Sequence, residues 1–426
     1  METHLADFIN NTPDGEEADA ILRRCVHCGF CNATCPTYQL LGDELDGPRG
    51  RIYQIKQVLE GATATAKTRL HLDRCLTCRN CETTCPSGVE YGRLLDIGRR
   101  VVETQAPRPS PERLARKLLG EALVRPGLFG AAARLGRLMR PLLPQKLTAK
   151  LPAPISRRSC ADERPAGGAR RMLVLRGCVQ PALAPNINAA AQRVLAHLGI
   201  DLVEADAAGC CGALRYHLND QAGGLADMRR NIDAWWPWIE SGGESGVEAI
   251  VMTASGCGVT VREYGHLLRH DPAYAQRAAR ISDLTRDLSE VVFDARERLK
   301  TALAIVDGPN TGRMHVAFHP PCTLQHGQKI NGVVEMLLND AGYTLTPIAD
   351  SHLCCGSAGT YSLLQPGLAT QLRDNKLASL LTGKPQIITS ANIGCISHLQ
   401  SGTVLPVRHW IELLDDRLAA TRSGRE

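Results

Sequence analysis

The stretch that decides the fold is CVHCGFCNATCP, residues 25–36. Its four cysteines follow the spacing C-x2-C-x2-C-x3-C and precede a proline, which is the bacterial ferredoxin pattern for [4Fe–4S] clusters. The same pattern returns as CLTCRNCETTCP, residues 75–86. Three thiolates spaced two residues apart can wrap one iron–sulfur cube, while the fourth, followed by a proline that turns the chain, points toward the other cube. The two runs therefore predict two [4Fe–4S] clusters that exchange one ligand each.

This exchange gives each cluster three cysteines from one run and one from the other. Cluster one is predicted to take Cys25, Cys28, Cys31 and Cys85, and cluster two is predicted to take Cys75, Cys78, Cys81 and Cys35. The alternative is a pair of zinc sites built from the same thiolates. Structural zinc sites usually join one C-x2-C pair to a distant second pair, and they need no third close cysteine. The spacing therefore favours iron–sulfur clusters.

Five arginines lie in or beside the two cysteine runs, namely Arg24, Arg49, Arg51, Arg74 and Arg79. Their charge would favour the reduced, more negative clusters or dock an acidic partner, and a solvated basic face is an equally good interpretation. The 39 residues between Cys35 and Cys75 exceed a minimal ferredoxin loop and include a predicted helix at Ile52–Leu59. Such an insertion is typical of a subunit rather than of a free carrier.

Cysteine is the unusual part of the composition. Its 17 copies make up roughly 4% of the 426 residues, well below the about 8–10% of small secreted disulfide scaffolds. The acidic opening METHLADFINNTPDGEEADA lacks the pattern of a signal peptide, and no run of 18 apolar residues occurs. We therefore expect a cytoplasmic protein whose thiolates bind metal and whose membrane contact is peripheral.

Charge and motif content exclude several classes of function. A net charge of +5 with 4% aromatic residues offers no concentrated basic surface for nucleic acid. The sequence contains neither a Rossmann glycine fingerprint nor a P-loop, so we expect no flavin, nicotinamide or nucleotide on this chain. The length is too great for one core and predicts two or three domains.

The second half of the chain contains an internal repeat. Thirty-one residues separate Cys178 from Cys210 and Cys322 from Cys354, and both spacers end at a Cys-Cys-Gly triplet. Helix-length stretches alternate with strand-like runs at 172–175, 201–204, 249–253, 316–318, 344–347 and 386–389. This alternation predicts two α/β units with mainly parallel sheets, whose cysteines lie at strand ends where such folds place their sites.

Each unit offers four thiolates. They are Cys178, Cys210, Cys211 and Cys257 in the first unit, and Cys322, Cys354, Cys355 and Cys395 in the second. Adjacent cysteines diverge in extended chain, so they could serve two irons of one cluster, or bind one ion where the following Gly212 or Gly356 permits a sharp turn. Three histidines, His319, His326 and His352, could complete a ligand set, although a histidine after a strand is more often a hydrogen-bonded loop residue. Cys160 is left over and is interpreted as incidental.

A basic, proline-rich segment joins the two halves of the chain. Between Arg108 and Arg171 it carries 15 basic residues against four acidic ones. Apolar residues recur there at helical spacing, namely Leu128, Ala131, Leu135, Leu138, Met139 and Leu142, with Arg134, Arg137 and Arg140 toward the other side. We predict an amphipathic helix whose apolar stripe packs on a neighbouring domain; docking on an anionic membrane surface is the alternative.

Together these features resemble a family, the iron–sulfur subunits of bacterial glycolate oxidase. Besides the two cysteine runs, the resemblance is carried by Gly47–Ile52, His319–Cys322, Leu353–Gly359 and Asn392–Cys395. It implies an α+β multidomain chain with a helical bis-[4Fe–4S] ferredoxin-like domain followed by two tandem α/β CCG-type domains. The predicted boundaries are 1–104 for the ferredoxin-like domain, 105–171 for the linker, and 172–300 and 312–426 for the two CCG domains.

The resemblance also implies an activity and partners. Flavoprotein (FAD) subunits of the same complex would oxidise glycolate to glyoxylate, and this chain, with no catalytic residue of its own, would pass their electrons toward quinone at the inner membrane. Related electron-transfer subunits of lactate or glycerol-3-phosphate dehydrogenases are the nearest alternatives. A heterodisulfide-reductase-like thiol–disulfide enzyme and a zinc-stabilised scaffold are more distant ones.

One departure concerns the CCG units. In heterodisulfide reductase the motif ends in Cys-x-x-Cys and supplies five ligands to a noncubane cluster, whereas here the earlier position is Ala254 or Asn392. This absence argues against a noncubane cluster. A third [4Fe–4S] cluster, a zinc ion in one unit, and purely structural thiols remain open alternatives.

Overall fold

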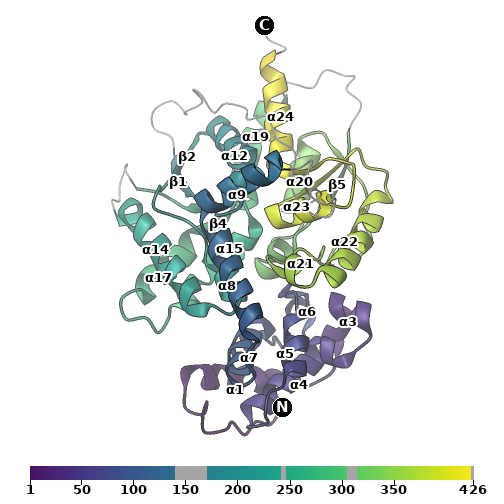
Figure 1. Cartoon of the computed structure of the whole chain (residues 1–426). Coiled ribbons are helices and arrows are strands. Elements are labelled where there is room, and N and C mark those ends of the chain that lie inside the picture. Colours follow the sequence, from purple (N-terminus) through teal and green to yellow (C-terminus); the bar gives the residue numbers. More distant parts are fainter. Residues whose placement is uncertain (140–169, 241–245, 305–313, 424–426) are drawn as a thin grey trace.

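The N-terminal unit is helical and lies below two α/β units in the computed structural model (Figure 1). The structure describes residues 1–139, 170–240, 246–304 and 314–423. The helices of the first unit are α1 (Pro13–Arg24), α2 (Phe30–Ala33), α3 (Pro36–Leu41), η1 (Glu44–Asp46), α4 (Pro48–Leu59), α5 (Ala66–Asp73), α6 (Asn80–Thr84) and α7 (Tyr91–Gln105). Their apolar faces enclose a separate core that includes Ile21, Leu22, Ile55, Leu94 and Leu95.

Local sequence explains where these helices begin and end. The Thr12 side chain accepts a hydrogen bond from the Gly15 N–H and caps α1, with Pro13 at the first helical position. Acidic residues occupy the first turn of α1 and arginines the last, which complements the helix dipole. Helix α4 lies within the insertion between the two cysteine runs, so the helix expected at 52–59 exists and begins four residues earlier.

Each CCG unit contains a four-stranded parallel sheet. The first sheet has the order β2-β1-β3-β4 and the second the order β6-β5-β7-β8, so the same topology occurs twice. The strands are β1 (Arg170–Val174), β2 (Ile200–Glu204), β3 (Ile250–Met252), β4 (Thr285–Asp287), β5 (His315–His319), β6 (Thr344–Leu345), β7 (Ile387–Ser390) and β8 (Val407–His409). The expected parallel sheets are present, and β4 and β8 are additional strands that the sequence did not predict.

Helices cover the faces of both sheets. In the first unit they are α11 (Gln180–Leu183), α12 (Asn186–His197), α13 (Ala213–His217), α14 (Gln221–Glu240), α15 (Ser255–Arg262), α16 (Tyr264–Leu267), α17 (Ala275–Leu284), α18 (Leu288–Asp294) and α19 (Arg296–Ala304). In the second unit they are η4 (Thr323–Gly327), α20 (Val333–Asp340), α21 (Tyr361–Leu364), α22 (Pro366–Leu381), α23 (Ile393–Gln400) and α24 (Trp410–Ser423). None of the helices in the described ranges is long and apolar enough to cross a bilayer.

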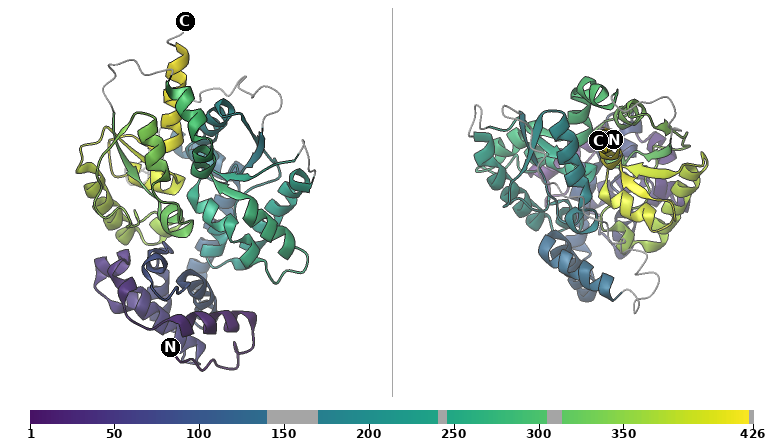
Figure 2. Two further views of the ribbon diagram at one scale, coloured as in Figure 1. Left: turned by 180° about the vertical axis from the view of Figure 1, so that it is seen from behind. Right: turned by 90° about the horizontal axis from the view of Figure 1, so that it is seen from above.

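The two CCG units lie side by side and share one core (Figure 2). Buried residues of both sheets belong to the same apolar cluster, including Val174, Val251, Val316 and Ile388. A buried ion pair joins α12 to α24, because Arg193 Nη2 lies 2.7 Å from Asp415 Oδ2. The two repeats therefore form one packed body.

The linker begins as two helices, α8 (Ser110–Val124) and α9 (Pro126–Leu138). Ala133 is buried, but Leu128, Leu135 and Leu138 of the predicted apolar stripe are exposed, Leu135 by 58%. Within the described residues, the expected packing of that stripe on a neighbouring domain is therefore not observed. Leu142 and Cys160 lie outside the described residues.

Candidate iron–sulfur and cysteine sites

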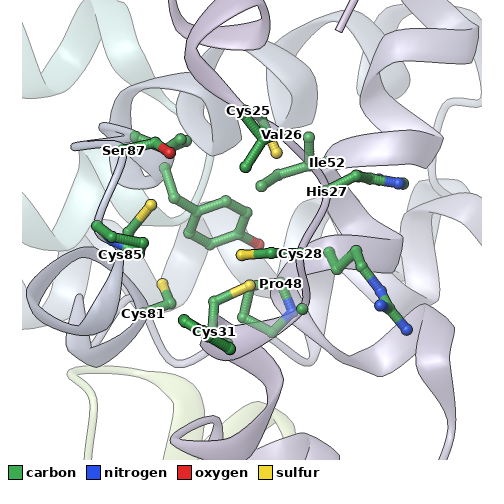
Figure 3. Close-up of a pocket in the computed structure, with 16 residues that line it drawn as sticks. Cys25, Val26, His27, Cys28, Cys31, Pro48, Ile52, Cys81, Cys85 and Ser87 are labelled. Atoms are coloured by element: carbon green, nitrogen blue, oxygen red, sulfur yellow. The ribbon is translucent and has the colours of Figure 1, made fainter.

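A pocket in the N-terminal unit is lined by the four cysteines predicted for cluster one, Cys25, Cys28, Cys31 and Cys85, together with Cys81. Figure 3 shows their sulfur atoms gathered around one space. The rim of this pocket is open and apolar, since Cys28 is exposed and Val26 and Phe30 are 68% and 61% exposed. This pocket therefore reaches the molecular surface.

A second pocket is lined by the four cysteines predicted for cluster two, Cys35, Cys75, Cys78 and Cys81. The two fourth cysteines exchange places as the spacing predicts, with Cys85 beside the first run and Cys35 beside the second. Cys81 and Tyr91 line both pockets, so the two sites are immediate neighbours. No disulfide joins the cysteines in the described ranges.

The two runs reach this arrangement with the same backbone turns. His27 and Thr77 occupy equivalent positions and both have a positive φ, 61° and 53°. The next equivalent pair is Gly29, with φ 87°, and Arg79, with φ 59°. These left-handed residues turn each run around its pocket, and glycine adopts that conformation more readily than arginine does.

Burial and mutual proximity raise the pKa of several of these thiols. Burial and the neighbouring Cys25 raise the pKa of Cys31 to about 11. Burial and the neighbouring Cys78 likewise raise the pKa of Cys81 well above its ordinary value. Buried thiolates this close together are costly unless a cation compensates them. Iron–sulfur clusters, which are ligated by thiolates, fit both donor sets in this respect.

A buried arginine lies beside the second pocket, a feature that the sequence did not reveal. Arg51 is 1% exposed, so the interpretation of this residue as part of a solvated basic face is wrong. Its Nη1 donates to Thr37 Oγ1 over 3.1 Å, and this hydroxyl lies 3.3 Å from Cys35 Sγ. Its Nη2 lies 3.3 Å from the buried Asp46 carboxylate, which also pairs with Arg74.

The second pocket faces the second CCG unit. Leu76 shares a small apolar cluster with Cys354 and Tyr361, and Cys78 and Cys322 pack against it. Polar contacts hold the same junction, because Thr83 Oγ1 lies 3.1 Å from His326 Nδ1 and Asn80 Nδ2 donates to the His352 carbonyl over 3.3 Å. The cysteines predicted for cluster two therefore lie next to Cys322 and Cys354.

The N-terminal unit also contacts the first CCG unit. Arg79 forms a two-pronged ion pair with Glu263, in which Nη2 lies 2.9 Å from Oε2. Arg79 directly follows Cys78 in the second cysteine run. The residue with the left-handed backbone thus also links the N-terminal unit to the first CCG unit.

The four cysteines of the first CCG unit come together near the carboxyl ends of its strands. Cys178 follows β1 and packs with Cys210 and Val124, while Cys211 is buried in the core beside Leu175. The neighbouring thiols act on one another, because Cys210 and burial raise the pKa of Cys178, and Cys210, Cys257 and burial raise the pKa of Cys211. The four thiols that the repeat marks as one set therefore lie in one part of the first CCG unit.

The second CCG unit groups its cysteines in the same order and adds a histidine. Cys322 Sγ lies 3.9 Å from Cys354 Sγ. Cys355 and Cys395 lie beside His319, and the three ligand atoms are within 4.8 Å of one another. Burial and the nearby Lys376 ammonium lower the pKa of His319 well below its ordinary value, which keeps the imidazole neutral.

Among the candidate histidines, His326 forms hydrogen bonds at the junction with the N-terminal unit. Its Nε2 lies 2.8 Å from the His352 carbonyl, and its Nδ1 lies 3.1 Å from Thr83 Oγ1.

Asn392 occupies the position where heterodisulfide reductase has a fifth cysteine. It accepts a hydrogen bond from the Gly256 N–H and donates one to Cys395 Sγ over 3.6 Å. This position therefore joins the two CCG units through an amide.

Comparison with known proteins agrees with this architecture. Residues 21–89 match the 4Fe-4S dicluster domain, and residues 172–262 and 316–400 match the cysteine-rich domain.

Full-length relatives extend the agreement to the whole chain. The glycolate oxidase iron-sulfur subunit of Escherichia coli is 56% identical over 418 residues, which cover 98% of this chain and 99% of the relative. The probable glycolate oxidase iron-sulfur subunit of Bacillus subtilis is 30% identical over 425 residues, covering 93% and 91%. Lactate utilization protein A of Bacillus licheniformis is 25% identical over 249 residues, covering 56% and 97%. The chain therefore belongs to the family of glycolate oxidase iron–sulfur subunits.

Proposed function

We propose that this chain is the electron-transfer subunit of a glycolate-oxidising complex whose flavoprotein subunits carry out the substrate oxidation. The observation that carries the proposal is the convergence of eight cysteines on two adjoining pockets, with Cys35 and Cys85 exchanged between the runs. The identity to glycolate oxidase iron–sulfur subunits over nearly the full length supports the choice of complex. When bound, two [4Fe–4S] clusters would accept and donate single electrons.

The chain's own residues have distinct roles in this proposal. The two cysteine sets would hold the two clusters, with Cys35 and Cys81 of the second set buried and Cys75 and Cys78 partly exposed. The exposed apolar rim at Val26 and Phe30 is the surface that a flavoprotein subunit would cover. The CCG cysteines remain candidate ligands for a third iron–sulfur cluster or zinc.

The proposed division of the chain follows the elements described above. We assign 1–104 to the ferredoxin-like domain, 105–171 to the linker, 172–300 to the first CCG domain and 312–426 to the second. Helix α7 ends at Gln105, and β1 and β5 begin at Arg170 and His315, which supports these boundaries to within a few residues.

The substrate is tested on the intact complex. The complex is purified anaerobically and mixed with glycolate, L-lactate or glycerol 3-phosphate, and reduction of its iron–sulfur clusters is followed by electron paramagnetic resonance. We expect glycolate to reduce the clusters much faster than the other two compounds. Faster reduction by lactate or glycerol 3-phosphate would assign the chain to a related dehydrogenase, and reduction by none of them would contradict the proposal.

We further propose that α9 brings the complex to the inner membrane, where quinone would accept the electrons. Leu128, Leu135 and Leu138 are exposed along this helix, and the segment that contains it is strongly basic. A basic helix with an apolar face binds anionic lipid surfaces through both features.

Vesicle flotation tests this part of the proposal. We expect the wild-type chain to float with vesicles containing anionic lipid, and the L128Q/L135Q/L138Q variant to remain in solution. The matched control is L381Q/V404Q, which removes two exposed apolar side chains elsewhere. Equal flotation of all three proteins would show that α9 is not the membrane-binding element.

A further inference from the structure

A buried group of nitrogen and sulfur donors lies at the carboxyl edge of the second sheet. His319 ends β5, Cys355 belongs to the Cys-Cys-Gly triplet after β6, and Cys395 lies in the first turn of α23. One ligand atom from each residue lies within 4.8 Å of the other two, and all three residues are buried. Three separate chain segments thus bring metal-binding atoms to one point.

The unsatisfied ring nitrogens of His319 are independent evidence for a bound ligand at this point. Its side chain is 1% exposed, and neither ring nitrogen has a hydrogen-bond partner among the described residues. A buried polar group without a partner is destabilising, so native proteins rarely leave both nitrogens of an imidazole unsatisfied. The backbone of His319 is fixed, because its carbonyl accepts from Ser390 Oγ over 2.9 Å. The imidazole is therefore held in a place where a ligand is required.

The three atoms lie close enough for small side-chain movements to bring them onto a single ion. In a tetrahedral zinc site, bonds of about 2.0 Å to nitrogen and 2.3 Å to sulfur place two ligand atoms roughly 3.5–3.8 Å apart. The three atoms here all lie within 4.8 Å of one another. Mixed imidazole and thiolate donors in a tetrahedral arrangement are typical of zinc.

The described residues of the first CCG unit contain no such donor set. Three residues before Cys322 the second unit has His319, and three residues before Cys178 the first unit has Leu175. Leu175 is buried in an apolar cluster with Cys211. An apolar side chain therefore occupies the position in the first unit that corresponds to the His319 imidazole in the second. The two repeats share their thiols but differ in this one ligand.

Charge at the second site is also balanced. The Lys376 side chain is 4% exposed and donates to the Asp350 carbonyl over 2.7 Å. Its positive charge acts on Cys354 and Cys355. A divalent ion bound by the Cys355 and Cys395 thiolates and the neutral His319 imidazole would carry no net charge, and the Lys376 ammonium would offset a further thiolate at Cys354.

We propose that His319, Cys355 and Cys395 bind one zinc ion in the second CCG unit, and that the first CCG unit binds none. The inference deepens the proposed function by choosing zinc over a third iron–sulfur cluster at this site, and it does not depend on the substrate of the complex. Zinc has no redox chemistry, so Cys355 and Cys395 would fix the unit that faces cluster two rather than carry electrons.

Metal analysis of the full chain tests the proposal. The chain is produced with zinc in the medium, purified anaerobically and analysed for zinc and iron by plasma mass spectrometry. We expect one zinc per chain in addition to eight irons. We expect H319L, which copies the first unit, to lose at least nine-tenths of the zinc and to keep its iron. The matched control C211S removes the thiol that corresponds to Cys355 and should keep its zinc.

A second variant and a spectroscopic readout separate ligand loss from misfolding. H319C supplies a thiolate in place of the imidazole and should retain zinc. Cobalt exchanged into the wild-type chain should give the intense d–d bands of a tetrahedral site. Absence of zinc from the wild-type chain, a total of twelve irons, or full zinc occupancy in H319L would overturn the proposal. The iron measurement tests the two N-terminal clusters, and the zinc measurement tests only the proposed zinc site. A chain with eight irons and no zinc would therefore overturn the zinc site and leave the proposed function intact.

Discussion

Arg51 Nη1 donates a hydrogen bond to Thr37 Oγ1 over 3.1 Å, although Arg51 is almost fully buried. The hydroxyl continues to Cys35 Sγ at 3.3 Å, so a guanidinium charge is connected to a predicted ligand of cluster two through one side chain. Hydrogen bonds and positive charge near cluster sulfurs raise reduction potentials, because the reduced cluster is more negative.

Removing the Arg51 charge is expected to lower the reduction potential of cluster two by about 60 mV, the equivalent of roughly 1.4 kcal/mol for one electron. The variant is R51M, and the measurement is a redox titration followed by electron paramagnetic resonance. D46N/R51M serves as the companion variant, since it avoids leaving the Asp46 carboxylate without Arg51. Unchanged potentials in both variants would show that the buried guanidinium serves the fold alone.

The left-handed backbone at Arg79 leads to a stability prediction. Alanine in this conformation is strained by about 1–2 kcal/mol, whereas glycine is not. Both R79A and R79G lose the ion pair with Glu263, but only R79G also relieves the left-handed strain that Arg79 itself carries, so we expect R79A to melt below both the wild type and R79G. The measurement is the apparent melting temperature under anaerobic conditions.

E263Q is the control for Arg79, since it weakens the same pair without changing the backbone at position 79. It keeps a non-glycine residue in the left-handed conformation, so it should melt closer to R79A than to R79G. An R79A variant at least as stable as R79G would contradict the strain assigned to this position.

The buried His409 makes stability depend on pH. Its Nε2 lies 3.0 Å from the Thr253 carbonyl and its Nδ1 accepts from the Ile411 N–H, so the neutral ring joins the two CCG units. Burial lowers the pKa of His409 from 6.5 to about 3. The unfolded chain therefore takes up a proton as the pH falls below 6.5, while the folded chain does not, and the folded state loses stability in that range.

The expected loss from His409 between pH 8 and pH 5.5 is about 1.4 kcal/mol. It is measured as the stability difference between wild type and H409Q at the two pH values, which should shrink toward pH 5.5. The wild type is compared with H409Q because a second group also titrates in this range. Burial raises the pKa of Asp287 to about 6, so protonation of Asp287 stabilises the folded state as the pH falls, opposite to the effect of His409. A difference that is constant with pH would contradict the buried neutral imidazole.

The sequence predicted the cysteine groups better than their surroundings. The spacing of cysteines along the chain determines which thiols can lie near one another. The exchange of Cys35 and Cys85 and the grouping of the CCG cysteines could therefore be predicted from the sequence. Strands β4 and β8 are short and contain charged residues, Thr-Arg-Asp and Val-Arg-His, so they lack the apolar run Ile-Val-Met that marks the equally short β3. The burial of Arg51 and the missing partners of His319 depend on contacts between distant segments, which no local pattern records.

The apolar rim of the first pocket predicts where a partner docks. Introducing a charge with F30E should reduce the rate at which the flavoprotein subunits reduce the clusters, by about tenfold or more, because a buried unpaired carboxylate is costly at an interface. The measurement is glycolate-dependent reduction in the reconstituted complex, with iron content checked first.

V404E is the matched control for F30E, because Val404 is fully exposed far along the chain in a loop before β8. It should leave the rate unchanged. Equal rates for wild type and F30E, with full iron content in both, would place the docking surface elsewhere.

The eight N-terminal cysteines are expected to hold two [4Fe–4S] clusters. Their cofactor content is measured by iron and acid-labile sulfide analysis of the anaerobically purified full chain. Eight irons and eight sulfides per chain are expected, and C28S and C78S should each lower both values. A chain that contains zinc at these cysteines and no labile sulfide would contradict the account.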